Sequence, residues 1–190
     1  LKLIGVDINK AARDASRNRL NKRNLDCIIM NGNISDPDSI NKKLNNKFNL
    51  NLSDFMNGRT FLDHNRIYSN PKSEKKLSKQ STGGFCFKGK YINSDQLGNN
   101  LIEHLTLWKP YINKYGIVIL ELHTIHPDES NKFRGENLSC AYDTTHGFSD
   151  QYLVEYDFFI YCAKIAGFKL SEKFVFPNSK IPTISISYFK

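Results

Sequence analysis

The sequence predicts an α/β fold whose sheet is mostly parallel and closes with an antiparallel hairpin. The chain opens with an apolar run over residues 1–8 that has Asp7 near its end, and a second apolar run covers 27–30. Each run is followed by residues that begin a helix, and alternating strands and helices are typical of a parallel sheet. Near the end of the chain, 169–176 and 183–189 alternate polar and apolar residues around a proline-containing turn, which indicates an antiparallel hairpin.

The first two helices are marked by residues that cap their amino ends. Asn9 is a suitable cap for a helix over about residues 10–22. Its expected apolar stripe consists of Ala12, Ala15 or Ser16, and Leu20. The continuous apolar run at 27–30 is typical of a fully covered parallel strand. Beyond it, Asp36 is expected to cap a second helix, with Pro37 at the first helical position.

The middle of the chain is predicted to hold one strand and a long polar segment. The strand lies around Leu50 to Met56 and leads into the polar run Arg59-Thr60-Phe61-Leu62-Asp63-His64-Asn65-Arg66. Residues 69–93 are rich in Lys and Ser and contain two adjacent glycines. Such a composition buries little apolar surface, so we expect a flexible polar loop or lid.

The second half shows the clearest periodicity. A helix is expected to begin at Asp95, and its apolar residues recur every three or four positions: Leu97, Leu101, Leu105, Trp108 and Ile112. The strongest strand covers 117–123. After a loop that extends to about residue 150, a helix over 152–166 ends at Gly167, where a left-handed conformation suits glycine. Its expected buried face is Val154, Phe158, Tyr161, Cys162 and Ile165.

Composition favours an ordinary globular protein. The 190 residues carry a net charge of +8, and Lys and Asn crowd together in loop-like segments, so nucleic-acid binding is not favoured. The four cysteines form no C-x-x-C pair, and Cys27 and Cys162 lie in apolar patterns, which indicates core thiols in a reducing compartment. Without a signal peptide or a membrane-length apolar run, we expect a single cytoplasmic domain over 1–190.

The order of these elements resembles class I, Rossmann-like methyltransferases that use S-adenosylmethionine (SAM). The motifs that carry the resemblance are Gly5-Val6-Asp7-Ile8-Asn9, Asn31-Gly32-Asn33-Ile34, Trp108-Lys109-Pro110 and the last hairpin. Two stretches, 59–66 and 142–152, are similar to methyltransferase domains of cyanobacterial polyketide synthase loading modules. The resemblance implies a first strand and a glycine-rich loop ahead of Leu1, so we interpret the chain as part of a longer protein.

The resemblance implies a set of cofactor-binding residues: Asp7, Ile8, Asn33, Ile34 and Asp54. A carboxylate offers two acceptors to the vicinal hydroxyls of a ribose, which suits Asp7; the alternative is an exposed Asp that caps the next helix. Asn33 would accept from the adenine amino group, or it is simply a turn residue. Asp54 or Met56 would end the strand near the reacting methyl group.

Histidines supply the expected chemistry. His64 and Asn65 follow a predicted strand and would line the substrate side, unless they belong to a surface loop in which Asp63 pairs with Arg66. His123, His146 and Gln151 could bind Mn²⁺ or Fe²⁺, or instead act as a general base and orienting donors. His104 and His126 are expected at the surface.

We therefore expect SAM-dependent methylation of carbon on a carrier-bound or small acyl substrate, with His64, Asn65, His123 and His146 as catalytic residues. Three alternatives stay open: a methyltransferase acting on nucleic acid or another small molecule, a nicotinamide dehydrogenase that shares the acidic strand end, and a non-catalytic truncated remnant. A small molecule or an acyl substrate bound to a carrier protein would be the partner, and no membrane is expected.

Overall fold

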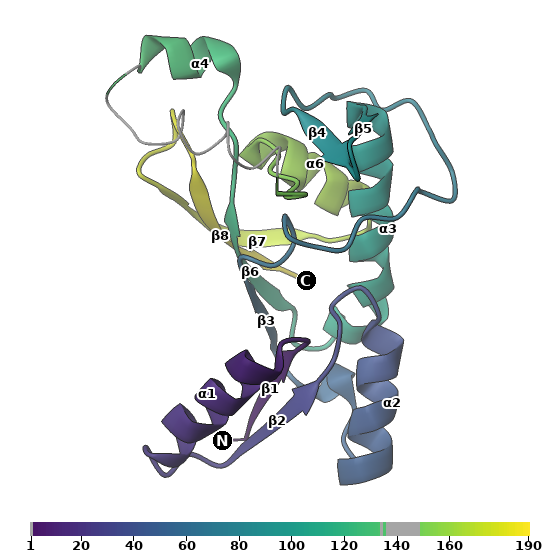
Figure 1. Cartoon of the computed structure of the whole chain (residues 1–190), viewed down its shortest axis with the longest axis vertical. Coiled ribbons are helices and arrows are strands. Elements are labelled where there is room, and N and C mark those ends of the chain that lie inside the picture. The colour runs from purple at the N-terminus through teal and green to yellow at the C-terminus, as the bar shows by residue number, and fades with distance from the viewer. Residues whose placement is uncertain (1, 134, 136–148) are drawn as a thin grey trace. The chain divides into compact units, whose positions relative to one another are not determined.

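The computed structural model describes residues 2–133, 135 and 149–190 (Figure 1). It divides into two compact units, Leu1–Leu52 and Ser53–Lys190, which are described separately below. The mixed α/β class expected from the sequence is confirmed. The expectation of one domain over the whole chain stays a prediction. No described helix combines 18 or more residues with the apolar composition that a membrane crossing requires.

The first unit contains two parallel strands and two helices. β1 (Leu3–Asp7) and β2 (Cys27–Asn31) pair in parallel, in a register that places Asp7 beside Asn31. α1 (Lys10–Asn21) begins at Asn9, whose Oδ1 accepts the backbone N–H of Ala11. α2 (Pro37–Phe48) begins at Asp36, as predicted, with its proline in the first turn.

The apolar residues of α1 and β2 are less buried than the sequence predicts. Along the expected stripe of α1, Ala12 and Leu20 are half-buried, Ala15 and Ser16 are exposed, and no residue of the helix is buried. The apolar residues of β2 are likewise half-buried rather than fully covered. A sheet of two strands offers too little surface to bury a helix face completely.

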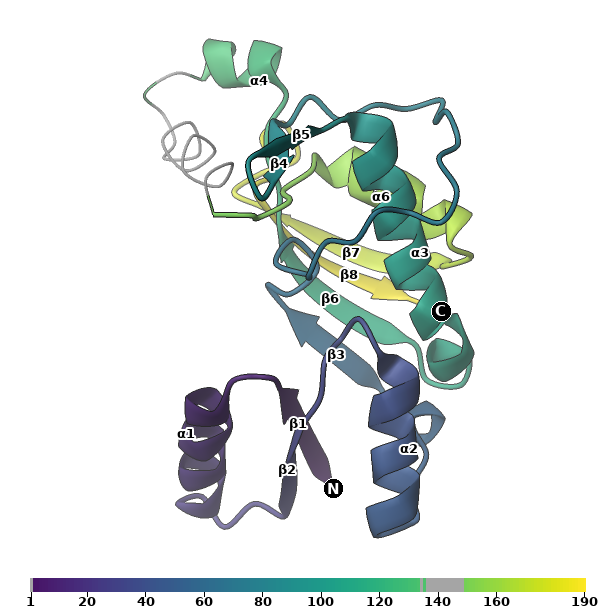
Figure 2. The ribbon, with the colours of Figure 1, turned by 45° about the vertical axis from the view of Figure 1, so that its right-hand side comes forward.

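The second unit contains a four-stranded sheet in the order β3-β6-β8-β7 (Figure 2). Its strands are β3 (Asn57–Thr60), β6 (Ile117–Leu122), β7 (Leu170–Phe176) and β8 (Ile184–Phe189). β3 pairs with β6 in parallel, whereas β8 is antiparallel to both neighbours, so the C-terminal hairpin is confirmed. Among the described pairings, two are parallel and three are antiparallel, so the described sheets are mixed rather than mostly parallel.

The strand predicted around Leu50 to Met56 is wrong. A 3₁₀ turn, η1 (Leu52–Asp54), occupies that stretch, and the strand itself starts at Asn57. The inward-facing residues of β3 are Asn57 and Arg59, which are both buried although they are polar. The apolar pattern of the sequence therefore predicts the strand too early, in the segment before Asn57.

Two helices cover one face of the four-stranded sheet (Figure 2). α3 (Ser94–Ile112) buries all five apolar residues of the predicted stripe. α6 (Tyr156–Ile165) starts four residues later than predicted, because 151–154 are extended and the carbonyl oxygen of Val154 accepts the N–H of Thr124. On α6, Phe158 and Cys162 are buried as expected, whereas Ile165 is exposed. The helix is followed by Gly167 at φ +86°, the left-handed position predicted for it.

The polar segment 69–93 contains a small hairpin that the sequence pattern does not reveal, β4 (Phe85–Phe87) with β5 (Lys90–Ile92). Leu77 and Ser81 are buried, and the Oγ of Ser81 donates to Glu155 at 2.6 Å. A short helix, α4 (Pro127–Lys132), lies in a segment expected to be loop. Whether 69–93 moves as a lid stays a prediction.

Candidate active site

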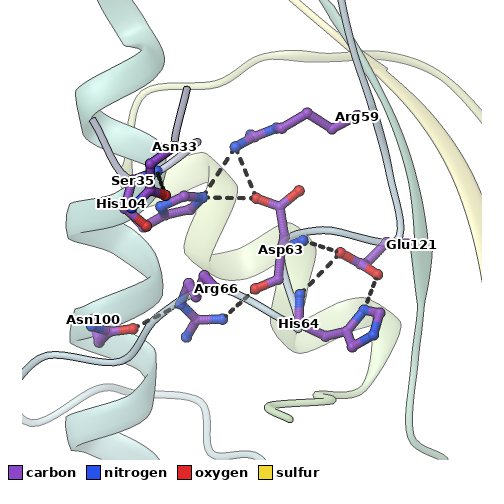
Figure 3. Close-up of polar contacts among 9 residues, drawn as sticks. All are labelled: Asn33, Ser35, Arg59, Asp63, His64, Arg66, Asn100, His104 and Glu121. Carbon is purple, nitrogen blue, oxygen red and sulfur yellow. Dashed lines mark hydrogen bonds and ion pairs between the residues drawn. The ribbon is translucent and has the colours of Figure 1, made fainter. Parts of the chain in front are cut away.

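A single carboxylate joins the two parallel strands of the second unit where they end. Glu121, near the end of β6, is only 1% exposed. Its Oε2 accepts the backbone N–H groups of Asp63 at 2.7 Å and His64 at 3.1 Å, and both residues follow β3. Its Oε1 lies 2.5 Å from Nδ1 of His64 and accepts the N–H of Leu122 at 2.8 Å (Figure 3). Glu121 thus fixes the loop after β3 against β6.

This contact also sets the tautomer of the His64 ring. A carboxylate accepts hydrogen bonds, so Nδ1 carries the proton and the neutral ring has its lone pair on Nε2. Carboxylates play the same orienting part behind histidines that bind metals or act as bases. His64 is therefore a buried histidine whose ring is oriented by Glu121, with its side chain 6% exposed.

A second buried cluster lies beside the first, around the carboxylate of Asp63. Oδ1 of Asp63 is 2.9 Å from Nη1 of Arg59 and 3.0 Å from Nε2 of His104, and the same Nη1 lies 3.1 Å from that ring nitrogen (Figure 3). Burial works against the charged form of Asp63, but Arg59 and His104 hold the pKa of its carboxyl below the usual range. The cluster therefore keeps a charged pair inside the unit.

His104 is not at the surface, contrary to the sequence prediction. It is 5% exposed on the inner face of α3, three residues after Leu101 on the same stripe. Burial lowers the pKa of His104 to about 4, so the ring is neutral near pH 7. His126, in contrast, is exposed as predicted, and its side chain caps α4.

The alternative in which Asp63 and Arg66 form a surface pair is wrong. Both residues are buried, and Arg66 donates to the backbone oxygen of Asp63 at 2.7 Å and to Oδ1 of Asn100 at 2.7 Å. The Arg66 guanidinium also lies 5.6 Å from the ring centre of Tyr152. Asn65 is exposed between these buried neighbours. The loop after β3 is thus anchored on both sides of His64.

His123 is buried in a setting that does not fit a metal ligand. Its Nδ1 donates to the backbone oxygen of Val154 at 3.2 Å, and its Nε2 then accepts from the Oγ of Ser185 at 2.8 Å. The rings of Tyr156 and Phe159 lie edge-on to it. Burial lowers the pKa of His123 to about 3. Both ring nitrogens are therefore engaged by the protein.

The predicted metal set is only partly described. His146 lies outside the described residues, and Gln151 is half-buried. Within residues 2–133, 135 and 149–190, no group of three His, Cys, Asp or Glu side chains is arranged to hold a metal ion. Since His123 does not fit the role either, no step of the chemistry below depends on a metal.

The predicted cofactor residues of the first unit lie at the carboxyl end of its two strands. Oδ1 of Asp7 accepts the N–H of Asn9 at 2.7 Å, while Oδ2 makes no hydrogen bond to another described residue. Ile8 is 61% exposed, and Oδ1 of Asn33 accepts the N–H of Ser35 at 2.9 Å. The turn alternative for Asn33 is therefore a real contact, whereas α1 is capped by Asn9 and Asp7 bonds to the backbone of that cap residue. These contacts still leave a carboxylate oxygen, an apolar side chain and an amide, which fits an adenosine group.

Asp54 does not occupy the place predicted for it. It belongs to η1, ahead of β3, and its carboxylate forms an exposed ion pair with Lys114 at 3.1 Å. Met56 also precedes the strand and is 64% exposed. Neither residue lies at the carboxyl end of a strand. Ile34 is half-buried in the turn before α2.

Three residues of the site are not singled out by the sequence prediction: Glu121, Arg59 and His104. Glu121 and His104 each interrupt an otherwise apolar, inward-facing pattern, and buried polar groups require partners. Glu121 is the only charged residue in the run 117–122, and that exception was the available signal.

An α/β domain with an oriented, buried histidine at the ends of two parallel strands is consistent with a group-transfer enzyme. The chain matches the AprA MT2-like domain over residues 1–187 and belongs to that family of methyltransferase domains. The resemblance to methyltransferase domains of polyketide synthase loading modules is thereby confirmed. A search of curated proteins gave no match.

Proposed function

We propose that this methyltransferase domain uses SAM to methylate carbon in an acyl group carried as a thioester. The observation that supports the proposal is the contact between Glu121 and His64. Transfer of a methyl group to carbon first requires an electron pair on that carbon, so a base must remove a proton. An oxygen or nitrogen acceptor already has a lone pair and needs such a base less.

His64 is the residue best suited to this work. With Nδ1–H donated to Glu121, Nε2 can take the proton next to the thioester carbonyl, which leaves the electron pair on the α-carbon. The carboxylate stabilises the imidazolium that forms, as in other histidine–carboxylate pairs. Asn65, adjacent and exposed, would contact the acyl group.

The first unit would hold the cofactor. Asp7 would accept hydrogen bonds from the ribose hydroxyls, Ile8 and Ile34 would contact the adenine ring, and Asn33 would bond to its amino group. When bound, SAM supplies a methyl group on a positively charged sulfur.

The test uses the full protein that contains this chain, with SAM carrying a ¹³C-methyl group and malonyl thioesters of a carrier protein. We expect ¹³C bound to the α-carbon of the acyl group, seen by mass spectrometry and NMR. His64→Ala should lower the rate about 10²–10⁴-fold. His126→Ala, an exposed histidine outside the site, is the matched control.

Two results would overturn the proposal. One is the absence of methyl transfer to any acyl thioester by the full protein, and the other is transfer at an unchanged rate by His64→Ala. A label found on oxygen or nitrogen would keep the methyltransferase and exclude the carbon acceptor. Methylation of RNA with a steep salt dependence would instead support a nucleic-acid substrate.

A further inference from the structure

A pocket of about 400 Å³ lies in the second unit between the β4–β5 hairpin and the first turn of α3. Its volume is in the range of small-molecule sites. The lining residues are Tyr68, Asn70, Phe87, Lys88, Lys90, Tyr91, Ile92 and Gln96. Aromatic and aliphatic walls are therefore combined with two ammonium groups and two amides.

Two lysines line this pocket, Lys88 and Lys90, and they belong to a basic segment. Segment 69–93 has six lysines against one glutamate, a net charge of +5 out of +8 for the whole chain. Among the described residues, neither Lys88 nor Lys90 has an acidic partner. The single acid, Glu74, accepts a hydrogen bond from Gln96. Two uncompensated ammonium groups at a pocket rim favour a phosphate or another anion.

The turn between β4 and β5 contains one of these lysines in an unusual backbone conformation. The hairpin turns through Lys88 at φ +51° and Gly89 at φ +75°, a two-residue turn in which both central residues are left-handed. Asn or Gly is the usual first residue of such a turn, so a lysine there is conformationally unfavourable. Lys88 is thus part of the turn itself, and Lys90 begins the strand that follows it.

One lining residue of the pocket, Tyr68, is linked through Tyr152 to the backbone of His64. The ring of Tyr68 packs against Phe87, with ring centres 5.3 Å apart, and against Tyr152 at 5.6 Å. Tyr152 in turn donates its backbone N–H to the oxygen of His64 at 2.7 Å. Tyr68 also belongs to the same loop, four residues after His64. Tyr68 and Tyr152 therefore connect the wall of the pocket to the backbone of His64.

We infer that this pocket binds the phosphopantetheine arm on which an acyl thioester is carried, by an acyl-carrier protein or by coenzyme A. Lys88 and Lys90 bind the phosphate at the rim, Tyr68 and Phe87 contact the apolar part of the chain, and Asn70 bonds to an amide of the arm. The thioester end then points toward His64. The inference rests on the proposed function for the identity of the acyl group, but binding of the arm can be measured by itself.

The first test compares 4′-phosphopantetheine with pantetheine, which lacks the phosphate, by calorimetry on the full protein. We expect the phosphorylated compound to bind about tenfold more tightly. Lys88→Ala with Lys90→Ala should abolish the difference. The matched control is Lys75→Ala with Lys76→Ala, which removes the same charge from the same segment outside the pocket. The inference would be overturned if both double variants lost the preference for the phosphorylated compound equally. It would also be overturned if the unaltered protein showed no such preference.

Tyr91→Ala is a second variant, since its side chain lines the pocket and is 77% exposed, so its loss leaves the core intact. It should weaken the binding of both compounds to a similar extent, and unchanged binding would count against the pocket. Comparing malonyl-carrier protein with malonyl-coenzyme A distinguishes the two sources of the arm. A lower KM for either one that disappears in the Lys88 and Lys90 double variant supports the inference.

Failure of this inference and failure of the proposed function give different results. If the phosphorylated compound binds more tightly but no acyl group is methylated, the inferred binding site is supported and the proposed carbon methylation is wrong. If malonyl-pantetheine is methylated with the same kcat/KM as malonyl-phosphopantetheine, the reaction stands and the pocket is wrong.

Discussion

Nδ1 of His64 lies 2.5 Å from Oε1 of Glu121, while Oε2 of the same carboxylate accepts the backbone N–H of His64 at 3.1 Å. One side chain from β6 therefore fixes both the ring and the backbone of a residue that follows β3. The backbone contact sets where the imidazole is, and the ring contact sets its rotation and tautomer. Positioning of this kind is what general-base catalysis requires.

Glu121→Gln tests this relationship. An amide can still accept from one backbone N–H, but its NH₂ group faces donors where the carboxylate accepted them, so the His64 ring loses its orientation. We expect methyl transfer to fall about 10²–10⁴-fold, with a shifted pH profile. Glu172→Gln, on exposed β7, should leave the rate unchanged. Equal rates for the Glu121 variant and the wild type would show that the contact is only structural.

Asp7→Asn tests the cofactor residues. The amide keeps the oxygen that accepts the N–H of Asn9, so the entry to α1 is preserved while the negative charge is lost. Charged hydrogen bonds contribute about 1.5–3 kcal/mol, so we expect SAM to bind about ten- to a hundredfold more weakly. Calorimetry with the full protein measures the Kd, and Asp26→Asn is an exposed control. An unchanged Kd would leave Asp7 with its turn-forming role alone.

The buried histidine of α3 predicts how stability depends on pH. Burial lowers the pKa of His104 to about 4 from about 6.5 in the unfolded chain, so the unfolded state binds the extra proton first. Its stabilising contribution is present above about pH 6.5 and is lost as the pH falls toward 4. Asp63, Arg59 and Arg66 are the charged groups that contribute to this pKa.

Thermal unfolding at pH 5 and pH 7 checks this expectation. A decrease in the free energy of unfolding on the order of 1 kcal/mol lowers the melting temperature by about 2–4 °C in a protein of this size. His104→Asn should reduce the difference between the two pH values, whereas His126→Asn should not. A variant of His104 with the full pH dependence of the wild type would assign the effect to other groups.

The core between α6 and α3 is the most sensitive place for a truncation. Phe158 is fully buried, and a Cβ added to Gly98 would lie 2.9 Å from its ring, so the two helices fit closely there. Phe158→Ala should lower the free energy of unfolding by about 3–5 kcal/mol, measured by urea denaturation. Phe174→Ala, at a side chain that is 59% exposed, should cost about 0.5 kcal/mol or less. Equal costs would indicate that the core at α6 is loosely packed.

Features with a local physical cause could be predicted from the sequence. The caps at Asn9 and Asp36, the stripe of α3 and the left-handed Gly167 each depend on residues within one or two turns of one another. The C-terminal hairpin was also predictable, because its alternating pattern flanks a turn. The sequence also predicts that His64 follows a strand, although the strand begins later than the apolar pattern indicates.

The features that the sequence does not predict depend on contacts between segments that are distant along the chain. Glu121 and His64 are 57 residues apart, and His104 and Asp63 are 41 apart, so no local pattern connects them. β3 was misplaced because its inward positions are polar Asn57 and Arg59, whose partners come from elsewhere in the fold.

The pairing of β6 with β8 has a consequence for synthesis of the protein on the ribosome. β8 spans Ile184–Phe189 and pairs with β6 from Ile117 to Leu122, while Ser185 supplies the hydroxyl bonded to His123. Before residue 189 leaves the exit tunnel, the strand that carries Glu121 has only the four residues of β3 beside it. Until then, chaperones that hold nascent chains would meet this strand with one edge unpaired.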